Sequence, residues 1–154
     1  MRNGKLCSGS ADTSIKIWNI KKDDSIQTFS NEDNNWVKCV FELDNGIIVA
    51  GCGNKIIKLW KPKSDNTYEI SKIIGAHSKE IRTLCQVDET HFASGSFDNT
   101  IKIWDIDTLE CVQTLDEQTS YILGIINLKM EGKQALASCS KDKTIKIWKK
   151  TRPK

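Results

Sequence analysis

Apolar and polar residues alternate along short stretches of this chain, and the same stretch occurs four times. Each copy has a small, mostly apolar run, a polar turn, and then isoleucine or leucine alternating with lysine up to a tryptophan. The four copies span residues 7–19, 49–61, 93–105 and 137–149. Alternation with a period of two is typical of β-strands with one buried face, and no segment of ten or more residues has a helical period. The pattern therefore predicts an all-β protein.

The repeat length indicates the kind of architecture. Trp18, Trp60, Trp104 and Trp148 lie 42, 44 and 44 residues apart. This period is in the range of propeller blades and is too long for the common helical-pair or leucine-rich repeats. A unit of this size cannot bury its own apolar faces, so each copy needs a neighbour and the copies share one continuous core.

Each copy is predicted to form four short strands. In the third copy we place them at about Ile81–Val87, His91–Ser96, Thr100–Asp105 and Glu110–Leu115, with turn signals between them. The fourth copy carries an insertion at Lys129–Gln134, which predicts a longer turn there.

The third copy carries a recognisable set of residues. Gly75-Ala76-His77 is followed by Ser94-Gly95-Ser96, Asp98 and Trp104-Asp105. In this order they resemble the WD-repeat β-propeller family, and the resemblance covers nearly the whole chain. In that family a buried His, Ser or Thr, Asp and Trp form a hydrogen-bonded tetrad within a blade. The resemblance implies a structural tetrad of His77, Ser94, Asp98 and Trp104. Such a network stabilises strand register, because a buried carboxylate and indole N–H are costly when unpaired.

The other copies depart from this pattern. The first keeps Ser8, Asp12 and Trp18, and the fourth keeps Ser138, Asp142 and Trp148. The His position falls before the start of the chain in the first copy and near Gln118 in the fourth. The second copy has Ala50, Asn54 and Trp60, with Asp33 near the His position. We expect one complete tetrad, and we expect the other blades to rely on packing.

The two ends of the chain are out of phase with the repeat. With the tryptophans superimposed, Met1 falls opposite Leu43 and Lys154 opposite Glu110. The expected blades cover residues 1–30 (strands two to four), 31–74, 75–115 and 116–154 (strands one to three). The expected fold is thus all-β: β-propeller blades of four-stranded antiparallel sheets, in an incomplete ring with partial blades at both ends.

Three explanations fit this phase. The chain is a fragment of a larger seven- or eight-bladed protein, one of several chains that assemble into a ring, or a strained four-bladed closure. Merging the partial blades would supply strands two and three twice, so a simple closure is not expected. Unpaired strand edges and uncovered blade faces favour association, and we expect self-association through the exposed end blades.

Composition and charge limit the classes of partner that we expect the chain to bind. The chain has 154 residues and a net charge of +3 from 23 basic and 20 acidic side chains, a balance that does not indicate nucleic acid. The basic end, Lys149 to Lys154, is interpreted as a solvated tail. The absence of a signal peptide and of an apolar run near eighteen residues indicates no membrane association and a place inside the cell, in the cytoplasm.

The cysteines and histidines offer little chemistry. None of the six cysteines lies in a two-residue-spaced pair, so we expect no metal site and reduced thiols buried as small hydrophobes. The cysteines are Cys7, Cys39, Cys52, Cys85, Cys111 and Cys139. His77 is assigned to the tetrad, and His91 has no nucleophile placed beside it by a known motif. The glycines of Ser8-Gly9-Ser10 and Ser94-Gly95-Ser96 are expected to allow close approach between strands. We therefore expect no enzyme and no cofactor.

Binding remains. In the WD-repeat family, the residue before the first strand and the residue before the tetrad Asp lie at the narrower face around the central channel. Carried over, these are Trp36, Glu80 and Tyr121, together with Ala11, Gly53, Phe97 and Lys141. Exposed aromatic residues often anchor protein interfaces. The implied partner-binding rim consists of Trp36, Glu80, Tyr121, Phe97 and Lys141.

The function expected from these features is a non-enzymatic protein–protein interaction module, a WD-repeat scaffold or adaptor segment that binds a protein or peptide at the propeller rim. The alternative is a structural half-ring that assembles with other propeller chains. A hydrolase or isomerase on this scaffold would require converging acids or a metal cluster, which the sequence does not show. Nothing in the sequence selects one partner or pathway.

Overall fold

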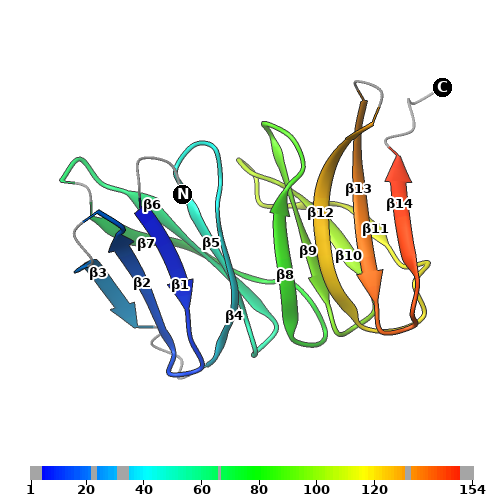
Figure 1. Ribbon diagram of the computed structural model, residues 1–154, viewed down its shortest axis with the longest axis horizontal. Helices are drawn as coiled ribbons and strands as arrows, with labels where there is room; N and C mark the ends of the chain where they lie inside the picture. The colour runs from blue at the N-terminus through cyan, green and yellow to red at the C-terminus, as the bar shows by residue number, and fades with distance from the viewer. Residues whose placement is uncertain (1–4, 22–23, 31–34, 66, 131–132, 150–154) are drawn as a thin grey trace. The chain divides into compact units, whose positions relative to one another are not determined.

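A computed structural model describes residues 5–21, 24–30, 35–65, 67–130 and 133–149 of the chain (Figure 1). Over these residues every regular element is a β-strand, which confirms the all-β prediction. Several residues singled out above lie outside the described ranges: Asp33 and the basic end beyond Lys149.

The strands form four antiparallel sheets in chain order. Two sheets have three strands: β1 (Lys5–Gly9), β2 (Ser14–Asn19) and β3 (Asp24–Ser30), and β12 (Ile122–Met130), β13 (Lys133–Ser140) and β14 (Ile145–Lys149). The other two have four: β4 (Val37–Glu42), β5 (Ile48–Cys52), β6 (Ile56–Pro62) and β7 (Tyr68–Gly75), and β8 (Ile81–Gln86), β9 (His91–Ser96), β10 (Ile101–Asp105) and β11 (Cys111–Leu115). We call these sheets blades one (β1–β3), two (β4–β7), three (β8–β11) and four (β12–β14). Within the described residues, blades one and four have three strands each.

Each strand of the third copy begins and ends within one residue of its predicted position. The prediction for the fourth copy was wrong in one respect. The inserted residues lengthen the hairpin itself, because β12 and β13 remain paired as far as Met130 and Lys133. The pairs Lys129–Gln134 and Met130–Lys133 thus extend the ladder of this hairpin.

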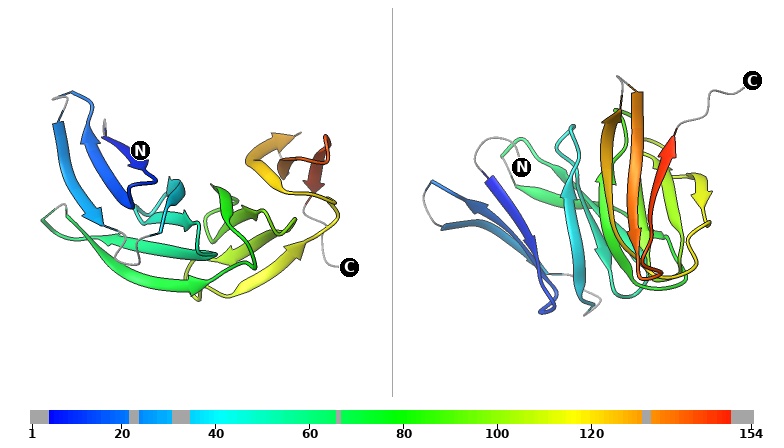
Figure 2. Two further views of the ribbon diagram at one scale, coloured as in Figure 1. Left: turned by 90° about the horizontal axis from the view of Figure 1, so that it is seen from below. Right: turned by 45° about the vertical axis from the view of Figure 1, so that its right-hand side comes forward.

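The chain divides into two compact units, Met1–Ile81 and Arg82–Lys154. In unit 1, Ile15 and Ile17 of β2 are buried against Val37, Ile48 and Trp60 of blade two. The Phe29 ring of β3 stacks on Trp60, with the ring centroids 5.7 Å apart. Blades one and two therefore pack face to face, as the blue and cyan strands in Figure 2 show.

Unit 2 repeats this packing with other residues. Ile101 and Ile103 of β10 lie in one apolar cluster with Ile122, Ile125 and Leu136 of blade four. In both units the isoleucine-bearing face of one blade covers the tryptophan-bearing face of the next. The alternation of isoleucine with lysine thus has a structural cause, because isoleucine and lysine point to opposite faces of the strand.

Glycine at one position makes this packing possible. A Cβ atom on Gly95 would lie 2.6 Å from Ile122 Cγ2 and 2.7 Å from Thr83 Cγ2. A Cβ atom on Gly9 would overlap Val37 in the same way. The close approach expected at the two Ser-Gly-Ser segments is therefore present, between blades one and two at Gly9 and between blades three and four at Gly95.

The turns that precede the tryptophan strands share one design. The residues Thr13, Lys55, Asn99 and Lys143 each have a positive φ, between 68° and 75°. In three of these turns the preceding aspartate accepts a hydrogen bond from the backbone N–H two residues on, as Asp98 Oδ1 does from Thr100 at 3.0 Å. Such Asx turns compensate for a left-handed residue that is not glycine.

Candidate functional site

Two predicted rim residues of unit 1, Trp36 and Glu80, form one small cluster with Lys38, which we call the Trp36 cluster. The Trp36 side chain is 54% exposed, and Lys38 Nζ lies 4.4 Å from its ring centroid. The same amine forms an ion pair with Glu80 Oε2 at 3.2 Å. The backbone N–H of Gly53 donates to the Trp36 carbonyl at 2.9 Å, so the loops of the predicted pair meet.

The predicted rim residues of unit 2 form a second group, the Tyr121 cluster: Phe97, Tyr121 and Lys141. The rings of Phe97 and Tyr121 stack with centroids 4.7 Å apart and an interplanar angle of 18°. Lys141 Nζ lies 5.1 Å from the Tyr121 ring, and its backbone N–H donates to the Tyr121 carbonyl at 2.9 Å. The stack therefore joins the β9–β10 turn of blade three to blade four.

The sequence interpretation missed Lys38, which connects Trp36 to Glu80. Strand alternation gave no signal for it, because Trp36 precedes β4 and the pairing of β4 with β5 is irregular between Val37 and Cys39. Both clusters combine an aromatic ring with an amine. A protonated amine over an aromatic face is attracted by the ring quadrupole, which orders both groups before a partner arrives.

The structure shows some of the hydrogen bonds that the expected tetrad requires. The Trp104 indole N–H donates to Ser94 Oγ at 2.8 Å, and both side chains are buried. Asp98 Oδ1 accepts a hydrogen bond from the Thr100 hydroxyl at 2.7 Å, and the His77 side chain is buried. The four-membered tetrad remains a prediction. The Trp–Ser bond itself recurs at 2.8 Å as Trp18 to Ser8 and Trp148 to Ser138.

Blade four corrects the expectation that the other blades rely on packing. Gln118, at the position of the missing histidine, is buried, and its Oε1 accepts from the Ser138 hydroxyl at 2.6 Å. Its Nε2 donates to Thr144 Oγ1 at 3.3 Å, and that hydroxyl donates to Asp142 Oδ1 at 2.6 Å. A glutamine amide has both a donor and an acceptor, so Gln118 connects the Trp148–Ser138 pair to the turn aspartate as a histidine ring would.

Blade two differs again. It has Ala50 where the other blades have serine, and the buried Oδ1 of Asn54 accepts no hydrogen bond from the part of the chain that the structure describes. An unsatisfied buried carbonyl is costly. For blade two the expectation of stabilisation by packing stands.

The second histidine lies in a polar turn rather than in a catalytic arrangement. His91 Nδ1 is 2.8 Å from Asp88 Oδ1 and 2.9 Å from the Thr90 hydroxyl. Burial raises the pKa of Asp88, but the hydrogen bonds from His91 and Thr90 outweigh it and hold that pKa below its usual value. A catalytic triad places the acid and the nucleophile on opposite ring nitrogens, whereas here both contact the same one. This geometry does not activate the Thr90 hydroxyl.

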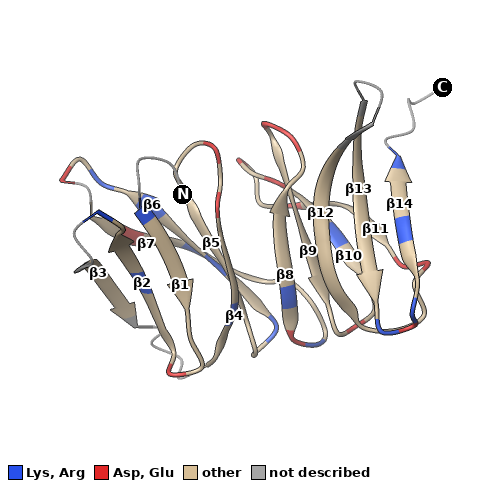
Figure 3. Cartoon of the chain, viewed as in Figure 1, with Lys and Arg blue, Asp and Glu red and all other residues tan. Residues whose placement is uncertain are grey.

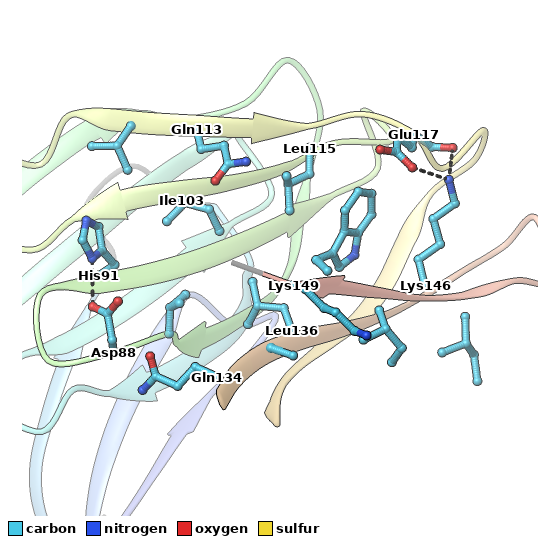
Figure 4. A pocket seen from close by; sticks show the side chains of 16 residues that line it. Asp88, His91, Ile103, Gln113, Leu115, Glu117, Gln134, Leu136, Lys146 and Lys149 are labelled. Carbon is cyan, nitrogen blue, oxygen red and sulfur yellow. Dashed lines mark hydrogen bonds and ion pairs between the residues drawn. The ribbon is translucent and has the colours of Figure 1, made fainter. Parts of the chain in front are cut away.

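An apolar pocket lies beside this turn, within unit 2 (Figure 4). It has a volume of about 820 Å³, is open to solvent, and is lined by residues of β10 and β11 on one side and of β13 and β14 on the other. The Asp88–His91 pair borders it at one end, and the Glu117–Lys146 ion pair, at 3.1 Å, at the other. Side chains of Ile103, Leu136 and Trp148 line the middle. No sequence pattern pointed to this pocket.

The six cysteine thiols differ in how deeply they are buried. All six cysteines are free, and burial raises the pKa of Cys85 to about 12, while burial and the nearby Glu42 carboxylate raise that of Cys7 to about 12. The expectation that every thiol is buried was wrong for two cysteines. Cys111 and Cys139 are exposed, because β11 is an outer strand and the Cys139 face of blade four is uncovered by any described residue.

Two further kinds of site, a metal centre and a membrane-spanning helix, were sought among the described residues. Over these ranges no group of three or more His, Cys, Asp or Glu side chains is placed to hold a metal ion. Nor do they contain a helix long and apolar enough to cross a membrane. In the cartoon of Figure 3, basic and acidic residues are interspersed over strands and turns.

Comparison with known proteins gives three results. The profile of the WD40 family (WD domain, G-beta repeat) matches residues 2–19, 23–61, 68–105 and 109–149. The nuclear distribution protein nudF of Aspergillus niger is 32% identical over 152 residues, which cover 93% of this chain and 32% of that protein. The kinesin-like protein KIF21A of Homo sapiens is 30% identical over 118 residues, 75% of this chain and 7% of that protein. The chain thus spans about a third or less of these two relatives.

One solved structure shows the fold. The crystal structure of the WD40 β-propeller domain of Doa1 superimposes with a TM-score of 0.82 at 21% identity. The match covers 97% of this chain and 48% of that chain.

Proposed function

Because this chain belongs to the WD40 repeat family, we propose that it is a non-enzymatic interaction module that binds a protein or peptide at the propeller rim. WD40 propellers are generally scaffolds without catalytic activity. The names of the two relatives agree with a module inside larger proteins, and the proposal takes no pathway from them. We further propose that the module works inside the cell, in keeping with its six free cysteines.

The observation that carries the proposal is the Tyr121 cluster. A stacked pair of aromatic rings beneath an exposed lysine offers a rigid apolar surface with a positive head group. Rigid aromatic side chains lose little conformational entropy on binding, and such residues dominate interface energetics. The Trp36 cluster supplies the same chemistry in unit 1. A segment with an apolar residue next to a carboxylate would suit both.

The rim hypothesis predicts selective losses of affinity. Peptides selected against the wild-type chain from a displayed random library should bind Tyr121→Ala and Trp36→Ala more weakly by about 1–3 kcal/mol, with little change in melting temperature. Ile73→Ala is the matched control, because Ile73 is an equally exposed apolar residue on β7 and lies outside both clusters. Equal losses in all three variants, or unfolding of the rim variants, would contradict a binding role for these aromatics.

The second candidate is the structural half-ring that assembles with other propeller chains. Exposed Ile145 and Ile147 on blade four favour it, because their counterparts in the other blades are buried. Sedimentation velocity separates the two functions, since the half-ring requires oligomers and the binding module does not.

A further inference from the structure

The lysine of the Trp36 cluster is already paired with an acid of the chain itself. Lys38 Nζ lies 3.2 Å from Glu80 Oε2 and 4.4 Å from the Trp36 ring centroid. The side chains of Lys38 and Glu80 are 21% and 40% exposed, so the ion pair is partly shielded from solvent. A carboxylate of a partner protein would meet an ammonium group whose charge is compensated.

The lysine of the Tyr121 cluster is in a different state. Lys141 is exposed, and in the part of the chain that the structure describes no ion pair joins it to an acid. Its neighbour Asp142 is engaged elsewhere, since Oδ1 accepts from the Thr144 backbone N–H at 2.9 Å and Oδ2 from the Thr119 backbone N–H at 3.0 Å. The positive charge therefore remains available beside the stacked rings of this cluster.

The two states follow from one position of the repeat. Ile81 begins β8 and Ile122 begins β12, so Glu80 and Tyr121 each come directly before the first strand of a blade. Blade three has a carboxylate at this position, whereas blade four has an aromatic ring. The carboxylate competes with an acidic partner for a nearby lysine, and the ring adds apolar contact area.

Displacement of Glu80 limits what an acidic partner gains at Lys38. The fold holds Glu80 within reach of Lys38, so its effective concentration there is high. A partner carboxylate replaces one ion pair by another, and a partly exposed pair contributes only about two- to fivefold in affinity. The Trp36 ring, 54% exposed, still offers an apolar contact.

We propose that Glu80 is an intramolecular competitor at the Trp36 cluster, and that an acidic segment of a partner protein therefore binds preferentially at the Tyr121 cluster. The segment has an aromatic or branched residue that packs on the rings, next to an aspartate or glutamate that pairs with Lys141. This inference rests on the proposed binding role of the rim, and it adds the selectivity between the two clusters.

The probe for the test is the synthetic peptide acetyl-Ser-Phe-Glu-Ser-amide, with acetyl-Ser-Phe-Gln-Ser-amide as its neutral counterpart. Each is titrated into the ¹⁵N-labelled full chain at a protein concentration at which light scattering shows a monomer. The chemical shifts of the Lys141 backbone amide and of the Trp36 indole N–H report the two clusters separately. The acidic peptide should saturate the Lys141 signal at a lower concentration than the Trp36 signal, and the neutral peptide should bind about two- to fivefold more weakly at Lys141.

Removal of the competing carboxylate is the decisive variant. Glu80→Gln should lower the concentration of acidic peptide that half-saturates the Trp36 signal about two- to fivefold, with no change at Lys141 and no gain for the neutral peptide. Glu69→Gln is the matched control, because Glu69 forms a similar ion pair with Lys63, at 3.1 Å, in unit 1 and outside both clusters.

The measurement separates this inference from the rim proposal. The inference is overturned if Glu80→Gln and Glu69→Gln respond equally at Trp36, or if Glu80→Gln weakens binding there, which would assign the cluster to a basic group of the partner. A saturable shift at Lys141 in either case leaves the rim proposal standing. If the acidic peptide shifts neither signal, both are wrong.

Discussion

Glycine and glutamine carry the most information at the scale of single residues. Gly95 permits contact between blades three and four, since any side chain there would meet Ile122 and Thr83. Gln118 performs the task that the family pattern assigns to histidine, with a hydrogen-bonding pattern that the residue type alone does not reveal. The role of Gly95 follows from what lies across the blade boundary, and that of Gln118 from polar partners within its own blade.

Gly95→Ala should destabilise unit 2. The added Cβ would lie 2.6 Å from Ile122 Cγ2, so the two blades must separate, and overpacking of this kind costs about 1–3 kcal/mol. Gly75→Ala is the matched control, because nothing lies within 4 Å of the Cβ built there. Chemical denaturation of both variants measures the difference. Equal stabilities would show that the blades are not in contact at Gly95.

Gln118→Ala should destabilise blade four. The change leaves the buried Ser138 hydroxyl without its acceptor at 2.6 Å, and loss of such a partner costs about 1–3 kcal/mol. Gln113→Ala should change the free energy of unfolding by less than about 0.5 kcal/mol, because that side chain is exposed. Thermal melts of the two variants provide the comparison, and a neutral Gln118→Ala would mean that the polar network contributes nothing to stability.

At the scale of elements, the hairpin turns determine where the tryptophan strands begin. In three of the four turns an aspartate precedes the left-handed residue and accepts a hydrogen bond from the backbone, and Asp142 accepts from both the N–H and the hydroxyl of Thr144, at 2.9 and 2.6 Å. These bonds favour the carboxylate form. The hydroxyl of Thr144, followed by backbone N–H groups, lowers the pKa of Asp142 from 3.8 to about 2.

This shift predicts a pH dependence. Because the pKa of Asp142 is lower in the folded than in the unfolded chain, its contribution to stability is present above about 3.8 and is lost as the pH falls towards about 2. Asp142→Asn removes the ionisable group, so its melting temperature should fall less steeply than that of the wild type across this window. Melts at a series of pH values test this, and parallel curves would exclude a role for the Asp142 carboxylate in acid unfolding.

At the scale of the whole molecule, the uncovered blade faces matter most. Ile145 and Ile147 of β14 are 75% and 44% exposed, whereas Ile101 and Ile103, at the same positions of β10, are buried. On blade one, Leu6 is 52% exposed, while its counterparts Ile48, Phe92 and Leu136 are buried. Within each unit, an isoleucine-bearing face of one blade covers a tryptophan-bearing face of the next, so the faces left open at blades one and four are of the two kinds that cover each other elsewhere.

We therefore expect association that increases with protein concentration. Ile147→Asp should reduce it, because a carboxylate on the open face of blade four is costly to bury. Ile20→Asp is the matched control, since Ile20 is exposed in a turn after β2. Light scattering across a dilution series measures the effect. A monomer at every concentration, with slow amide exchange in β1 and β14, would refute association through these faces.

The sequence by itself determined the strands, the turns and the repeat. Alternating residues before each tryptophan and the aspartate in each turn act over a few neighbouring positions, so local reasoning placed β8 to β11 within one residue. The resemblance to the WD-repeat family, rather than local reasoning, grouped Phe97, Tyr121 and Lys141, and in the structure these three side chains lie together.

Only the tertiary structure decided which faces are covered and which polar groups find partners. Gln27 and Tyr68 are 41 residues apart, and Ser138 and Gln118 are 20 apart, so no local pattern relates them. Cys139 looks like the other small strand residues in sequence, yet it is exposed because no described residue covers its face. Burial depends on what lies across the blade boundary, and pairing depends on residues distant in sequence; a repeat sequence is nearly the same whether or not a neighbour is there.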